Sequence, residues 1–232
     1  MLTRRTLLAS PVALAACATT DSDDGAEALL RRAIDAAGGQ AALERARVLA
    51  WTGSARIHIG EQVIEIGVNT VVEPFTYARS ETWLLSQGPS SARVLEITSD
   101  GGWATRNGER TAMPAVQVAH ERQQYAMYGL MRFVTLRDPG ATFALDGANT
   151  LRVTHPQAAD ATLTFGGDDK LIEAHNTVVN SEPGGAPIAQ VFRFMDTIEG
   201  GGVRWPRRMS ITQSGVLFFE LTLDSFTPRQ QR

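Results

Sequence analysis

The sequence has few features, apart from its hydrophobic residues, that could stabilise a fold, and it has little net charge. Cys17 is the only cysteine among 232 residues, so no disulfide can form within the chain. The formal net charge is −3 and the isoelectric point is about 5.8, so there is no basic field to hold nucleic acid. The sequence contains no internal repeats, and its 21 glycines are dispersed as turn residues. We therefore expect one domain that depends on its hydrophobic core and sheet for stability.

A metal-binding motif is also lacking. His120-Glu121 begins like the H-E-x-x-H zinc motif, but Gln124 stands where the second histidine is required. An amide oxygen is a poor substitute for imidazole on Zn²⁺, and the other histidines lie in separate predicted strands. We predict no metal site and no cofactor, and we interpret His120-Glu121 as a surface pair on a helix.

A catalytic nucleophile with a base beside it is equally hard to find. The segment 52–56 lacks the second glycine of a G-x-S-x-G elbow, and Gly200-Gly201-Gly202 precedes a predicted strand instead of a helix. We expect that the protein is not an enzyme. An unrecognised hydrolase is the weakest alternative, which loss of activity on mutating His120 or His175 would support.

The N-terminus, in contrast, is informative. Arg4 and Arg5 precede the uncharged run from Thr6 to Ala16, which is far shorter than the ~20 residues of a membrane-spanning helix. Leu14-Ala15-Ala16 directly before Cys17 resembles the bacterial lipobox, in which the cysteine receives lipid such as palmitate. We predict lipidation at Cys17, and the alternative is cleavage after an A-x-A site. The paired arginines leave both Sec and twin-arginine (Tat) export open.

These patterns divide the chain into three parts. Residues 1–16 are a cleaved lipoprotein signal peptide, residues 17–25 are the lipidated cysteine with a flexible polar tether, and residues 26–232 form a single domain. A residue other than aspartate after the lipidated cysteine usually accompanies outer-membrane sorting, and Ala18 fits this rule. We therefore expect a protein that is anchored to the outer membrane by its lipid and faces the periplasm.

Periodicity in the domain predicts mainly strands with few helices. Helical spacing covers residues 26–37, residues 40–47 and a mid-chain segment from about Pro114 to Phe133. Period-two alternation predicts a hairpin with strands on both sides of Gly60-Glu61. Further strands are expected at 77–84, 93–99, 103–106, 109–111, 142–145, 150–155, 161–165, 171–180, 188–196, 203–205, 208–212 and 216–226. In the last of these, Phe218 is expected to face away from Phe219.

The order of elements resembles the LolA/LolB-like superfamily of periplasmic lipoprotein carriers. The resemblance lies in residues 28–39, in the strand from Val48 to Gly53 and in the stretch from Phe194 to Met209 with its G-V-x-x-P sequence. It implies a strongly curved antiparallel half-barrel (α+β, mainly β) whose concave face is covered by an N-terminal and a mid-chain helix. Well-known members hold acyl chains in that hollow. A tethered member is more similar to the receptor LolB than to the soluble carrier LolA.

We therefore expect a lipoprotein that binds a lipid or the acyl chain of a lipoprotein in an apolar hollow, with a role in lipid or lipoprotein trafficking. The alternative is a non-catalytic envelope scaffold with a solid core and an unidentified protein partner. Replacing two helix methionines by glutamate is expected to abolish binding while preserving the strands. The side chains expected to line the hollow are apolar: Trp51, Ile57, Ile64, Ile66, Trp83, Trp103, Met127 and Met131.

Overall fold

The computed structural model describes residues 20–232. Cys17 and the predicted signal segment 1–16 lie outside these residues, so lipidation and export remain predictions. The described helices are α1 (Thr20–Ala36), α2 (Gln40–Arg45) and α3 (Ala115–Leu130), with short 3-10 segments at Pro89–Ser91 and Val134–Arg137.

Within residues 20–232 the strands form one antiparallel 13-stranded sheet. They are β1 (Leu49–Ile59), β2 (Gln62–Glu73), β3 (Tyr77–Leu84), β4 (Arg93–Ile97), β5 (Gly102–Arg106), β6 (Glu109–Ala112), β7 (Thr142–Leu145), β8 (Thr150–Thr154), β9 (Ala161–Phe165), β10 (Leu171–Val178), β11 (Ile188–Gly200), β12 (Val203–Gln213) and β13 (Val216–Phe226).

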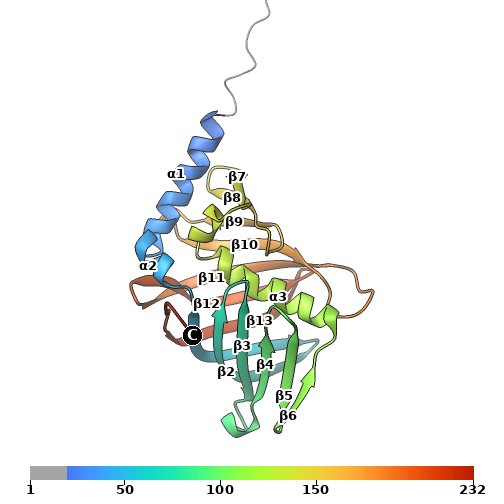
Figure 1. The fold of residues 1–232 in the computed structure, drawn as a ribbon. Coiled ribbons are helices and arrows are strands. Elements are labelled where there is room, and N and C mark those ends of the chain that lie inside the picture. The colour runs from blue at the N-terminus through green and yellow to red at the C-terminus, as the bar shows by residue number, and fades with distance from the viewer. Residues whose placement is uncertain (1–19) are drawn as a thin grey trace, which may run out of the picture.

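The strand order places the first and last strands together at the centre. It runs β6-β5-β4-β3-β2-β1-β13-β12-β11-β10-β9-β8-β7, so each half of the chain builds one arm of the sheet. The outermost strands β6 and β7 do not pair with each other, and the sheet remains open. Figure 1 shows α3 lying across the curved sheet and α1 beside the β7–β9 arm. The expected open, curved antiparallel architecture is confirmed.

The core lies between the helices and the concave face of the sheet. Leu29 and Leu30 of α1 and Met127 and Leu130 of α3 are each at most 1% exposed. They share one hydrophobic cluster with strand residues such as Phe192. Because an open sheet must bury its apolar face against another layer, the two helices are required for the curved sheet to be stable.

The β1–β2 hairpin forms around the turn predicted at Gly60-Glu61. Trp51 pairs with Thr70, Ala55 with Ile66 and Ile57 with Ile64. In β1 the side chains of Trp51 and Ala55 are buried while Thr52 and Arg56 are exposed, so the alternation in the sequence identified the inner face correctly.

Three boundaries differ from expectation. Helix α1 begins at Thr20, so residues 20–25, which the sequence suggested were part of the tether, belong to a helix that packs along β7. Helix α3 ends at Leu130, short of the expected Phe133, whose positive φ of 57° is incompatible with a continuing helix. Strand β12 continues through Pro206, which pairs with Thr197 of β11. Its ladder with β13 begins only at Arg208, so on that side the missing amide of the proline interrupts no bond.

Candidate functional site

A hollow of about 280 Å³ lies between α3 and the central strands of the sheet. The strands β4, β3, β2, β1 and β13 form its floor and walls, and α3 forms its roof. Its lining residues are Trp51, Ile57, Ile66, Val68, Thr70, Ser80, Thr82, Arg93, Leu95, Glu121, Tyr125, Tyr128, Phe218, Phe219 and Leu221. The volume is close to the lower end of the range for small-molecule sites.

The floor is apolar because β1 and β2 turn their hydrophobic positions inward. The ring of Trp51 lies 4.9 Å from the ring of Tyr128, centroid to centroid, and the two are tilted by 54°. Tyr128 therefore covers one end of the floor from the helix above. This contact fixes the distance between α3 and the sheet at that end of the hollow.

A β-bulge in β13 adds a second phenylalanine to the hollow. Ile211 pairs with Phe219 and Thr212 with Leu217, so Phe218 is an extra residue in the ladder. Both Phe218 and Phe219 line the hollow, although strict alternation would have turned Phe218 outward. The expected face of Phe218 was therefore wrong, and the bulge is the reason.

One wall of the hollow is polar. The hydroxyls of Thr70 and Ser80 lie 2.8 Å apart in a buried hydrogen bond between β2 and β3. Arg93 of β4 and Glu121 of α3 also line the hollow, on the same side as these hydroxyls. The cavity therefore has an apolar floor and, along one wall, side chains that can form hydrogen bonds or carry charge.

Burial controls the ionisation of the helix residues in this wall. It raises the pKa of the Glu121 carboxyl, an effect that His120 and Arg93 partly oppose. Burial also raises the pKa of Tyr125 and Tyr128, so both phenols keep their protons. The wall consequently carries less negative charge than its composition suggests.

The expected lining residues divide into two groups. Trp51, Ile57 and Ile66 line the hollow, and Ile64, the register partner of Ile57, packs half-buried against the core. Trp83 lies on the opposite face of the sheet, where its ring covers Gly67 so closely that a Cβ at that glycine would approach it to 2.2 Å. The expectation that Trp83 faces the hollow was wrong.

Trp103 is also on the outer face. It pairs across the strands with Glu96, and the guanidinium of Arg110 lies 4.3 Å from the centre of its ring. An indole at a strand position on the outer face can be stabilised by stacking with arginine without being buried in the core. The expected position of Trp103 in the hollow was therefore wrong for a reason that hydrophobicity alone does not reveal.

The two methionines of α3 are core residues. Met127 is 1% exposed and does not border the hollow. Met131 is 3% exposed and borders a separate cavity of about 50 Å³ beside α1 and Trp205. Both side chains face the packed interior, so the expectation that they line the ligand hollow was wrong.

His120 and Glu121 do not form a surface pair. His120 is 9% exposed, and its Nδ1 donates a hydrogen bond of 2.7 Å to the carbonyl oxygen of Val179. The amide of Gln124 lies 3.3 Å from the other ring nitrogen. His120 thus fastens α3 to the end of β10, while its neighbour Glu121 turns to the hollow. His175, in contrast, pairs with Glu173 at 2.7 Å on the exposed face.

Sequence reasoning missed Arg93, Glu121 and Tyr125 as wall residues. Glu121, Tyr125 and Tyr128 are spaced at i, i+4 and i+7, which places them on one face of a helix. That spacing was a usable signal. It was hidden because an acidic residue beside a histidine was interpreted as a solvent-facing pair.

Exposed apolar side chains lie near the ends of the strands that form the hollow. Ile59 lies two residues beyond Ile57 on β1, and Leu84 is the register partner of Ile66. They are 56% and 38% exposed, and Val216 near the start of the bulged strand is 70% exposed. We call Ile59, Leu84, Val216 and Phe218 the apolar rim.

Two other kinds of feature, a metal-binding cluster and a membrane-spanning helix, are absent from residues 20–232. No group of three or more histidine, cysteine, aspartate or glutamate side chains is placed to hold a metal ion there. Among the helices of the same part of the chain, none has the length and hydropathy to cross a membrane.

Comparisons with known proteins agree with this geometry at the level of the fold. No family model matches the chain, and no curated protein matches it in sequence. A LolA superfamily protein from Nitrosomonas europaea is similar in structure, with a TM-score of 0.56 and 11% identity over 89% of this chain and 94% of that chain.

Two further solved structures are similar. A DUF1329 family protein from Desulfovibrio piger has a TM-score of 0.55 at 10% identity, over 88% of this chain and 93% of that chain. A domain assigned to outer membrane lipoprotein sorting in Vibrio parahaemolyticus has a TM-score of 0.51 at 8% identity, over 88% of this chain and 92% of that chain. The chain therefore has the LolA-like fold that its sequence resembled.

Proposed function

We propose that the protein is a lipid-anchored envelope lipoprotein that binds a lipid or another apolar ligand in the hollow beneath α3, without catalysing a reaction on it. One observation carries the proposal. The concave face of the sheet is not filled by side chains but leaves a cavity of about 280 Å³ on an apolar floor. A solid scaffold with this fold would have no reason to leave that space open.

The fold of the similar structures supports this function, because one of them is assigned to lipoprotein sorting. Anchoring through Cys17 and a place on the periplasmic side of the outer membrane are part of the same proposal. The apolar rim offers exposed apolar side chains to an acyl chain, and Phe218 belongs both to this rim and to the lining of the hollow. Each methylene buried there contributes roughly 0.8 kcal/mol to binding.

The first experiment identifies the ligand. The full chain carrying Cys17→Ser, which removes the predicted lipid, is purified from a periplasmic fraction without detergent. Its organic extract is analysed by mass spectrometry, and a fluorescent fatty acid is then titrated. We expect a reproducible hydrophobic compound near one per chain, or saturable uptake of the probe. An empty extract together with no uptake would contradict the proposal and favour the scaffold.

A matched pair of substitutions locates the bound probe. Phe218 and Leu217 are neighbours with the same exposure of 36%, but only Phe218 lines the hollow. Phe218→Ser is expected to weaken probe binding by about tenfold or more, because covering the exposed aromatic side chain with a bound chain contributes up to roughly 1.5–3 kcal/mol. Leu217→Ser is expected to change it by less than about twofold. Equal effects would place the probe elsewhere.

A further inference from the structure

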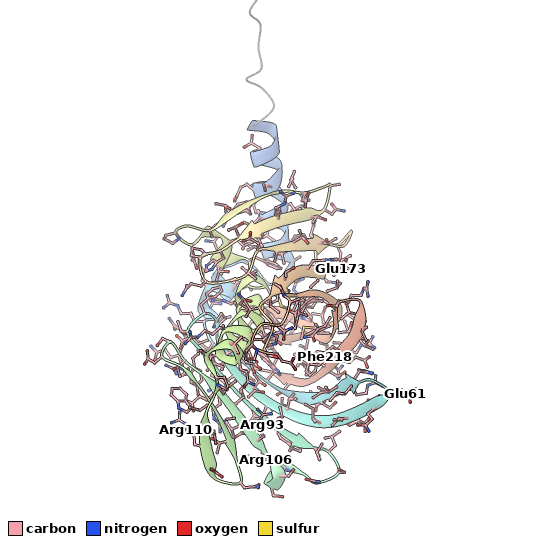
Figure 2. The ribbon with its side chains drawn as sticks, turned by 90° about the vertical axis from the view of Figure 1, so that its right-hand side faces the viewer. Glu61, Arg93, Arg106, Arg110, Glu173 and Phe218 are labelled. Atoms are coloured by element: carbon pink, nitrogen blue, oxygen red, sulfur yellow. The ribbon has the colours of Figure 1, made fainter. Side chains whose placement is uncertain are left out.

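Two arginines lie at the margin of the hollow or next to it: Arg93 is one of its lining residues, and Arg106 is on the neighbouring strand β5. Arg93 lines the hollow at the exposed end of β4, next to Thr82 in the β3–β4 register. The β4–β5 ladder pairs Val94 with Thr105, so its next position places Arg106 opposite Arg93. Both arginines are exposed, and Figure 2 shows them close together at the lower end of the sheet.

Neither Arg93 nor Arg106 takes part in an ion pair within residues 20–232. The outer face of the same strands is different. There Arg79 pairs with Glu81 at 2.6 Å, and Arg110 pairs with Glu96 at 3.4 Å. On this arm of the sheet the outer arginines Arg79 and Arg110 are held in ion pairs, whereas Arg93 and Arg106 on the inner side are in none, although the β5–β6 register places Glu109 beside Arg106.

The hollow has one carboxyl among its lining residues, that of Glu121. Burial disfavours the charged form of this group, so it offsets the arginines less than an exposed glutamate would. An anion placed between Arg93 and Arg106 would relieve their mutual repulsion and gain charge-assisted hydrogen bonds from both guanidinium groups. A cation would add to the repulsion.

The apolar part of the hollow lies away from Arg93 and Arg106, toward β13. Phe218 on β13 and Arg93 on β4 come from the two strands that bound the hollow on opposite sides, and both are marked in Figure 2. Between them lie Trp51 and the inward side chains of β1 and β2. A cavity of about 280 Å³ suits one acyl chain better than several.

We propose that the hollow binds a single-chain amphiphile with an anionic head group, whose head is held by Arg93 and Arg106 at the margin and whose chain lies on the apolar floor. This inference rests on the proposed function, because it names the class of ligand for the same hollow. A fatty acid carries both features in one molecule. Its carboxylate accepts hydrogen bonds from guanidinium groups, which are rigid planar donors suited to such anions.

The test compares three probes that share one chain and differ in the head. Dodecanoate, dodecanol and dodecyltrimethylammonium are titrated by calorimetry, below their micelle concentrations, into the full chain carrying Cys17→Ser. We expect dodecanoate to bind at least about tenfold more tightly than dodecanol, and the cation most weakly. Arg93→Gln should weaken dodecanoate by about tenfold or more and leave dodecanol within about twofold.

Arg110→Gln is the matched control. It removes the same charge from the same arm of the sheet, but on the outer face against Trp103. It should leave all three affinities within about twofold. Acetate is the remaining arm: we expect it not to displace dodecanoate, whereas displacement would indicate a site for small free anions and overturn the amphiphile.

The outcomes separate the two proposals. If the three probes bind with equal affinity, or if Arg110→Gln acts as strongly as Arg93→Gln, the anionic selectivity is wrong while ligand binding in the hollow stands. If none of the probes binds and the fluorescent fatty acid is also refused, the proposed function fails and this inference fails with it.

Discussion

The ring of Phe75 stacks on the imidazole of His155, with centroids 4.3 Å apart and planes inclined by 12°. Phe75 lies in the β2–β3 turn and His155 directly follows β8, so the stack joins the two arms of the open sheet. Phe75 has a φ of 72°, a conformation that is strained for a bulky residue. Its ring also touches α3 at Gly129, where a Cβ would lie 2.3 Å from the ring.

This contact predicts the effect of a small side chain in α3. Gly129→Ala should destabilise the protein by about 1–3 kcal/mol, because the added methyl overlaps the Phe75 ring. In a helix without that neighbour, alanine would instead be favoured by up to about 1 kcal/mol. Urea denaturation of the two proteins measures the difference.

A double-mutant cycle identifies the cause. In a Phe75→Ala background the ring is gone, so Gly129→Ala should become neutral or stabilising. Additive effects of the two substitutions would show that the cost of the alanine has another origin than Phe75.

The positions of the tryptophans predict a pattern of quenching. Trp51 lines the hollow, whereas Trp83 and Trp103 lie on the outer face. A fatty acid brominated along its chain quenches indoles that it touches, so it should quench the native protein. Trp51→Phe should remove most of the quenching, and Trp83→Phe and Trp103→Phe should retain it. Loss of quenching in either outer-face variant would contradict the assignment.

The buried position of Met127 reverses the expectation for its substitution. Met127→Ala should lower the free energy of unfolding by about 2–5 kcal/mol, because it leaves a cavity in the core. Probe affinity of the folded fraction should stay within about twofold, since Met127 does not border the hollow. A glutamate at this position would prevent folding by burying a charge, so the loss of binding first expected from it would not report on a pocket.

Glu121 predicts a pH dependence of stability with a defined sign. Because its pKa is raised in the folded protein, the folded state holds a proton that the unfolded chain has released. The free energy of unfolding contributed by this group therefore falls as pH rises from the unfolded pKa of about 4.3 through the folded one. In Glu121→Gln the free energy of unfolding should not fall over this pH range, and at neutral pH it should be higher than that of the native protein. Urea unfolding across the pH range measures it.

Glu81 supplies the control of opposite sign. A hydrogen bond from Arg79, opposed by partial burial and aided by the charge of Arg79, lowers the pKa of Glu81. Its contribution is present above the unfolded pKa and is lost as pH falls through the folded one. Glu81→Gln should therefore cost stability at neutral pH and approach the native protein in acid. If the free energies of unfolding of the two variants depended on pH in the same way, these assignments would be contradicted.

Local patterns in the sequence predicted most of the fold. Alternation gave the boundaries of β3, β7, β9 and β13 and the inner face of β1, because burial on one side of a strand has a period of two. The break expected at Pro206 did not occur, because whether a proline interrupts a ladder depends on the neighbouring strand at that point. Such information is not local.

The candidate site was less predictable for the same reason. Trp83 and Trp103 are as apolar as Trp51, and only the pairing of Trp83 with Gly67 and of Trp103 with Glu96 places them outside. The inward turn of Phe218 depends on one extra residue in β13 relative to β12. Neither the register of paired strands nor a bulge can be identified from the alternation of a single strand.

The pairing of β1 with β13 has a consequence for how the protein folds during its synthesis. Two strands that are adjacent at the centre of the sheet are separated by almost the whole chain, from Trp51 to its register partner Phe226. During synthesis the first arm must wait, with the edge of β1 unpaired, until the last strand emerges. Contacts between such distant segments slow folding and leave strand edges open to association. The C-terminal strand β13 therefore determines when the sheet can be completed. A chain that stops before residue 216 would have both arms of the sheet but would lack the strand that joins them.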